Sequence, residues 1–260
     1  MLKDITLGQY FPGNSIAHKL DPRTKILLVT LYIIALFSAK GWMGYAVMVV
    51  TLAACVKVSH VGLRALVRGL KPLVFIIAFT GILNMFFTPD THYLWEWGIL
   101  RVSVKGIENA LFMVIRIMLL VMGTFLMTYT TSPIRLTDGL ESLLNPLKKI
   151  HVPVHELAMM MAIALRFIPT LIEETDKIMS AQKARGADFD SGNIFQKAKA
   201  LVPILVPLFI SAFRRADELA TAMECRCYHG GEGRTKLHVL KYQRRDYVAL
   251  AGGVVILALV

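Results

Sequence analysis

The chain has 260 residues, of which 55% are hydrophobic and only 18% charged, with a mean hydropathy of +0.57 and a net charge of +11. A soluble domain of this length is usually less apolar and more charged, so the composition excludes an ordinary soluble globular protein. The basic excess does not indicate nucleic-acid binding, because the cytoplasmic loops of membrane proteins accumulate Lys and Arg.

Five apolar segments with little charge predict membrane-spanning helices. In chain order they cover residues 26–39, 42–56, 72–87, 107–131 and 247–260. The residues before the first segment predict an ordered cytoplasmic lead-in rather than a cleaved signal peptide. Several segments rise less than the ~30 Å hydrocarbon core, so we expect flanking residues to extend their helices or the bilayer to be locally thin.

The charged loops predict how these helices are oriented. The stretch 57–71 carries Lys57, Arg64, Arg68 and Lys71 and no acid, and residues 132–246 hold 17 of the 29 basic residues. The connection 88–105 is mixed in charge. We therefore expect the N-terminus and residues 132–246 in the cytoplasm. The expected fold is an all-α integral membrane protein with about five transmembrane helices and a cytoplasmic region of long amphipathic helices.

Three parts follow along the chain. Residues 1–131 form the lead-in and a four-span membrane bundle, residues 132–246 the cytoplasmic helices, and residues 247–260 a final transmembrane helix. The first long cytoplasmic helix is expected to end at Gly186, a residue type suited to a left-handed helix stop. Residues 200–213 are uncharged but contain two prolines, so we interpret them as a buried or interfacial helix rather than a sixth span.

Patterns for catalysis are missing from the sequence. No G-x-x-x-x-G-K-[ST] motif occurs, so this chain is not expected to hydrolyse ATP. The stretch CRCYH offers two thiols and a histidine, but a closed zinc site needs a fourth ligand and a more usual spacing. We therefore expect no enzyme activity, no metal and no cofactor in this chain.

Two charges lie within the 107–131 segment. Arg116 is costly inside a membrane and is expected to pair or to face a cavity. Glu108 lies about two turns earlier on a similar helix face. Two interpretations stay open, a structural pair between them and a functional role for Arg116, including that of a membrane-embedded enzyme.

A short polar element occurs twice. SAQKARG at 180–186 aligns with TAMECRC at 221–227, so that Arg185 corresponds to Arg226. Each Arg ends an amphipathic helix and has small neighbours, which would let another protein surface approach closely. The planar guanidinium of an Arg in such a setting suits an acidic, hydrogen-bonding groove on a partner protein. The simpler interpretation is that each Arg is a solvated residue at a helix end.

This layout resembles the transmembrane T component of energy-coupling factor (ECF) transporters, the EcfT family, over essentially the whole chain. That family has a membrane bundle followed by coupling helices that end in Ala-Arg-Gly-type motifs. Ala184, Arg185 and Gly186 match the first motif fully, whereas Cys225, Arg226 and Cys227 keep only the Arg of the second.

The resemblance implies a set of partners and a location. It implies two ABC-type ATPase subunits, which bind ATP and Mg, together with a vitamin-binding membrane S component. The inexact second motif suggests that the two ATPases differ from one another. The three residues at each helix end would dock the ATPases, in a bacterial cell membrane. The candidate S-component platform comprises Met159, Met160, Ile163, Leu201, Leu205, Leu208 and Phe209. The alternative is that these apolar faces only pack on each other. A T component dedicated to cobalt or nickel uptake is the alternative within the same fold.

Overall fold

The computed structural model describes residues 10–88, 93–97, 100–187, 189, 194–231 and 239–260. Contacts divide these residues into two compact units. Residues 10–143 and 240–260 form one, which we call the bundle unit. The described residues of 144–239 form the other, which we call the two-helix unit.

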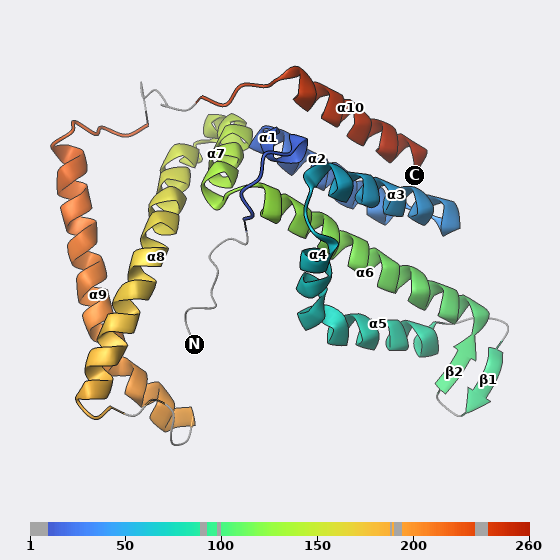
Figure 1. The fold of residues 1–260 in the computed structure, drawn as a ribbon, viewed down its shortest axis with the longest axis horizontal. Helices are drawn as coiled ribbons and strands as arrows, with labels where there is room; N and C mark the ends of the chain where they lie inside the picture. The colour runs from blue at the N-terminus through green and yellow to red at the C-terminus, as the bar shows by residue number, and fades with distance from the viewer. Residues whose placement is uncertain (1–9, 89–92, 98–99, 188, 190–193, 232–238) are drawn as a thin grey trace. The chain divides into compact units, whose positions relative to one another are not determined.

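The bundle unit is helical except for one short hairpin (Figure 1). Its helices are α1 (Ile16–Lys19), α2 (Pro22–Ser38), α3 (Gly41–Ser59), α4 (Leu63–Leu70), α5 (Val74–Phe87), α6 (Val104–Thr130), α7 (Pro133–Leu144) and α10 (Arg244–Leu259). A 3₁₀ turn, η2 (Lys71–Leu73), separates α4 from α5. Strands β1 (Tyr93–Trp97) and β2 (Leu100–Ser103) pair antiparallel between α5 and α6, within the connection of mixed charge.

Local capping explains where the main helices begin. Asp21 caps α2 by accepting a hydrogen bond from the Arg23 amide at 2.9 Å, and Pro22 occupies the first turn, where its missing N–H costs nothing. Ser103 caps α6 through the Gly106 amide at 2.9 Å. At the start of α10, Gln243 and Asp246 form a reciprocal capping box.

The core of the bundle unit is formed by side chains from α2, α3, α4 and α6. Leu36, Met48 and Leu66 are fully buried in it. Residues near the end of α10 pack against the same core, although α10 follows the two-helix unit in sequence. Helix α6 runs along the bundle in Figure 1, and α2 and α3 each pack against it.

Four described helical stretches are long and apolar enough to cross a membrane. Three of them, Gly41–Ser59, Leu63–Phe87 and Val104–Thr130, contain predicted spans. The fourth is Val154–Ala184, whose apolar first half was predicted to belong to a coupling helix. The two remaining predicted spans lie in α2 and α10, which have 17 and 16 residues. The expectation of a multi-pass, all-α membrane protein is confirmed.

The two-helix unit contains a 3₁₀ turn, η3 (Asn145–Ile150), and two long helices, α8 (Val154–Ala184) and α9 (Ile194–Glu224). Each long helix has 31 residues. Pro203 and Pro207 lie inside α9, and Figure 1 shows that this helix bends near its start. A proline removes one backbone hydrogen bond and crowds the preceding turn, which accounts for the bend.

Candidate functional site

Arg185 is the C-cap of α8 and lies on the surface of the two-helix unit. Gly186 follows it with φ of +87°, and the predicted left-handed stop at this residue is thereby confirmed. The Ala187 amide donates to the Gln182 carbonyl, and the Gly186 amide donates to the Lys183 carbonyl, both at 3.0 Å. These two bonds make a Schellman cap, which fixes the backbone on both sides of Arg185.

Arg226 has the same place at the end of α9. The Tyr228 amide donates to the Met223 carbonyl at 3.1 Å, and the Cys227 amide donates to the Glu224 carbonyl at 2.9 Å. Cys227 adopts φ of 57°, the left-handed conformation that Gly186 has in the first element. The two elements therefore share one backbone geometry although their sequences differ, and each presents an exposed Arg at the C-cap.

Helices α8 and α9 pack antiparallel. The Gln182 side chain donates to the Pro203 carbonyl at 3.3 Å. Glu174, eight residues before Gln182 on α8, accepts from Ser211, eight residues after Pro203 on α9. Gly231 lies against the His155 ring, which brings the chain after α9 back to the start of α8. Arg185 and Arg226 therefore lie at opposite ends of the pair, separated by about 40 Å along the helices at 1.5 Å per residue.

Glu174 joins the two helices with its carboxylate. One oxygen accepts from the Ser211 hydroxyl, and the other forms an ion pair with Arg215 Nη2 at 2.8 Å. The sequence interpretation missed this contact. A signal was present, since the alignment that matches Arg185 with Arg226 also matches Glu174 with Arg215, so equivalent positions in the repeat carry opposite charges.

The antiparallel packing separates the predicted platform residues into two groups. Those on α8 lie near its start, whereas those on α9 lie beside the second half of α8. Met160, Leu201, Leu205 and Phe209 are exposed, and Phe209 is 61% exposed. Met159, Ile163 and Leu208 are partly buried. The exposed apolar surface on α9 continues to Phe213, which is 72% exposed.

Arg116 and Glu108 have different partners in the part of the chain that the structure describes, so the interpretation that they pair with each other is wrong. Arg116 Nε donates to the Tyr45 hydroxyl at 2.9 Å, and Glu108 accepts from Trp42 Nε1 at 3.1 Å. Both partners lie on α3, where Phe112 stacks on Tyr45. Two turns of helix α6 separate the charges too far for direct contact, and aromatic side chains on α3 satisfy each one instead: the Tyr45 hydroxyl accepts from Arg116 and the Trp42 indole donates to Glu108.

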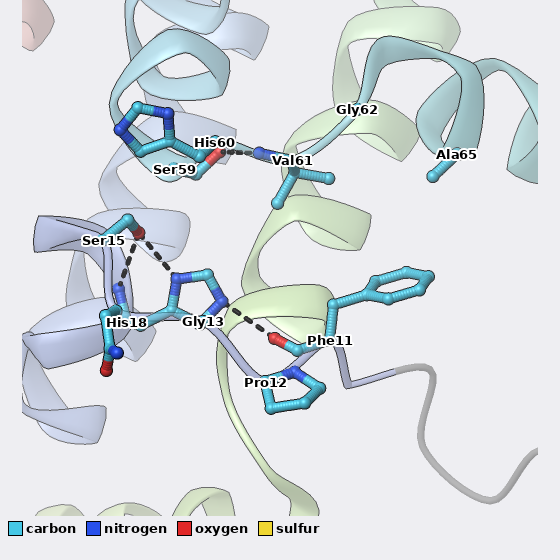
Figure 2. Close-up of a pocket in the computed structure, with 11 residues that line it drawn as sticks. Phe11, Pro12, Gly13, Ser15, His18, Ser59, His60, Val61, Gly62 and Ala65 are labelled. Carbon is cyan, nitrogen blue, oxygen red and sulfur yellow. Dashed lines mark hydrogen bonds between the residues drawn. The ribbon is translucent and has the colours of Figure 1, made fainter.

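A cavity of about 540 Å³ lies in the bundle unit between residues 11–18 and the α3–α4 connection. Figure 2 shows His18 on its wall. The His18 Nε2 atom lies 2.9 Å from the Phe11 carbonyl, and Nδ1 lies 2.6 Å from the Ser15 hydroxyl. A carbonyl can only accept, so Nε2 carries the proton and Nδ1 accepts from Ser15. Both ring nitrogens thus have partners, and this histidine holds residues 11–18 together, while the Phe11 amide donates to the Tyr129 carbonyl on α6 at 3.0 Å.

Cys225 and Cys227 are exposed free thiols. Among the described residues, no group of three or more His, Cys, Asp or Glu side chains is arranged to hold a metal ion. The small side chains beside Arg226 leave its guanidinium accessible, as Ala184 and Gly186 do beside Arg185.

Known proteins resemble this chain over nearly its full length. The sequence profile of the CbiQ family, described as "Cobalt transport protein", matches residues 13–237. A protein of Ruminiclostridium cellulolyticum named energy-coupling factor transporter transmembrane protein EcfT is 55% identical over 246 residues, covering 95% of this chain and 92% of that protein. Proteins of the same name from Clostridium kluyveri and Bacillus subtilis are 57% and 46% identical, covering 96% and 100% of this chain and 93% and 98% of their own lengths.

Proposed function

The chain belongs to the family of energy-coupling factor transporter transmembrane proteins, EcfT, and from this membership we propose how it couples its transporter. The transmembrane T component carries movement from two ABC-type ATPase subunits, bound in the cytoplasm, to an S component that binds a vitamin or another micronutrient in the bacterial cell membrane. The ATPases, and not this chain, bind ATP and Mg. Arg185 and Arg226 each dock one ATPase subunit.

The single observation that carries this proposal is the shared cap at the two helix ends. Two equivalent, backbone-fixed arginines at opposite ends of one antiparallel pair suit a partner made of two similar subunits. An Arg guanidinium offers five donors in a planar fork, which fits carboxylates and backbone carbonyls in a groove. When the ATPases approach one another, force applied at both ends acts on a single packed unit.

The link at Glu174 is one of the contacts that join the two helices of that unit. It lies between the two helix ends, so a push on Arg185 or Arg226 is transmitted through the α8–α9 contact rather than absorbed by it. Rigid-body movement of packed elements is a common form of coupling. The exposed apolar side chains of α9 provide the surface on which an S component rests, whereas Met160 lies apart from them near the start of α8.

The test is affinity purification of the complex through a tag on this chain. The wild type is expected to retain two ATPase subunits and one or more small membrane proteins. The Arg185→Glu, Arg226→Glu double variant should lose the ATPases, whereas each single variant keeps part of them, since one buried interfacial charge costs about 2–5 kcal/mol. A Lys177→Glu, Arg214→Glu variant is the matched control, because both residues are exposed on the same two helices. Normal ATPase retention in the Arg185→Glu, Arg226→Glu double variant would contradict the docking role.

A cobalt or nickel T component is the second candidate, favoured by the description of the CbiQ family. The copurified membrane proteins distinguish the two. A vitamin-binding partner supports the first function, and a dedicated metal-uptake partner supports the second.

A further inference from the structure

Helix α4 is a short helix that runs crosswise to its neighbours in the bundle unit. Figure 1 shows it turning away from the direction of α5 at the 3₁₀ turn η2. Residues Leu63–Phe87 are apolar enough to cross a membrane as one helix, but the turn divides them. The eight residues of α4 rise about 12 Å, which cannot span a ~30 Å hydrocarbon core.

The inner face of α4 fixes it on α6. Leu66 and Leu70 are buried, and the Tyr129 hydroxyl on α6 donates to the Ala65 carbonyl at 3.4 Å. A Cβ atom added at Gly69 would lie 2.5 Å from the Phe125 ring. The helix is therefore held tightly against α6, and its outer residues keep a defined direction.

The outer face of α4 has an apolar edge beside a basic edge. Leu63 is 64% exposed and Val67 is 56% exposed, one turn apart. Arg64 and Arg68 form the adjacent edge and are also exposed, as are Lys57 and Lys71 on either side. Among the described residues, none of these four bases has an acidic partner, and residues 57–71 contain no acid.

We propose that α4 lies in the membrane interface and binds anionic phospholipids, with Arg64 and Arg68 contacting the lipid phosphates. A helix with an apolar edge and a basic edge suits this position, because the first enters the acyl region and the second reaches the headgroups. Lys57 and Lys71 add to the attraction.

The exposed residues beyond the turn favour lipid over a protein occupant. Val74, Phe75 and Ile76 begin α5 and are 56%, 79% and 55% exposed. They follow α4 in a helix that belongs to a candidate membrane span, so apolar side chains are exposed on both sides of the turn. An acidic protein surface would pair with the four bases but would leave this apolar surface without a partner.

The test measures lipid binding to the full chain, purified in mild detergent with its partner subunits. Native mass spectrometry gives the affinity for phosphatidylglycerol and, separately, for phosphatidylcholine. Each basic residue near an anionic surface contributes about fivefold, so the Arg64→Gln, Arg68→Gln variant should bind phosphatidylglycerol about 25-fold more weakly. Phosphatidylcholine binding should not change. The Arg64→Lys, Arg68→Lys variant should keep most of the affinity.

The matched control is Lys148→Gln, Lys149→Gln, which removes two adjacent exposed bases from η3. It should leave phosphatidylglycerol binding unchanged. Inorganic phosphate in tenfold excess should not compete with the lipid. The proposal is overturned by equal phosphatidylglycerol affinity in the Arg64→Gln, Arg68→Gln variant and the wild type, by full competition from inorganic phosphate, or by loss of partner subunits from that variant while lipid binding is retained.

Discussion

Cys227 occupies a backbone conformation that glycine adopts more easily. Its φ of 57° follows from the Schellman cap at the end of α9, where Gly186 holds the equivalent place in α8. A side chain in this conformation costs about 1–2 kcal/mol, part of which is offset because glycine has more freedom in the unfolded chain. We predict that Cys227→Gly stabilises the end of α9 by about 0.5–1 kcal/mol. Amide hydrogen exchange over residues 225–228 should slow by about two- to fivefold.

Cys225→Gly is the control for Cys227→Gly, because it removes the other thiol at a helical position. The Cys225 amide donates to the Thr221 carbonyl at 3.0 Å, the spacing of a continuing helix. Glycine is unfavourable there by a few tenths of a kcal/mol, so exchange should become faster. Equal effects of the two substitutions would mean that the loss of a thiol, and not the backbone conformation, controls this helix end.

The α8–α9 pair includes a polar link between Glu174 and Arg215. Their side chains are 21% and 37% exposed, so solvent screens the charge attraction and the ion pair alone contributes little. Glu174 also accepts from Ser211, and Arg215 Nε is buried without a hydrogen-bond partner among the described atoms. We predict that Glu174→Arg or Arg215→Glu destabilises the unit by about 1 kcal/mol, seen as a lower thermal midpoint.

The exchanged pair, Glu174→Arg with Arg215→Glu, should recover about half of that loss, since opposite charges again face each other. Transport per ATP hydrolysed should follow the same order if the link carries force between the helix ends. Glu173→Arg is the matched control, because Glu173 is the exposed neighbour of Glu174. If transport per ATP hydrolysed were unchanged in both Glu174→Arg and Arg215→Glu, other contacts between α8 and α9 would transmit the force.

The sequence predicted single elements better than the relations between them. Gly186 marked the end of α8 correctly, because glycine signals a left-handed stop, whereas no residue-type signal marked Cys227. The apolar run 72–87 predicted a span, yet the separate helix α4 before it was missed, since the direction of a chain after a turn depends on tertiary packing. The aromatic partners of Arg116 and Glu108 were missed for the same reason, because the packing of α3 against α6 brings Tyr45 and Trp42 within hydrogen-bond distance of them.

The bundle unit is completed by a helix from the end of the chain. Asp246 at the start of α10 is 1% exposed and accepts from the Asp21 amide at 2.9 Å and from the Gln243 amide at 2.7 Å. Arg23 lies 4.0 Å from the centroid of the Tyr242 ring, and Gly253 lets α10 approach Leu28 on α2. The two-helix unit is therefore inserted into the sequence of the bundle unit, with both of its chain ends connected to that unit.

Asp246 is the residue that we expect to contribute most to holding α10 on the bundle unit. Asp246→Ala leaves the Asp21 amide buried without an acceptor and removes the cap of α10, at a cost of about 2–4 kcal/mol. We expect a lower thermal midpoint and faster proteolysis of residues 240–260 in the purified protein. Asp246→Asn keeps one acceptor oxygen and should lie between the alanine variant and the wild type. If α10 stayed as protected in Asp246→Ala as in the wild type, then apolar packing against α2 and α3, rather than this buried carboxylate, would hold the last helix on the bundle.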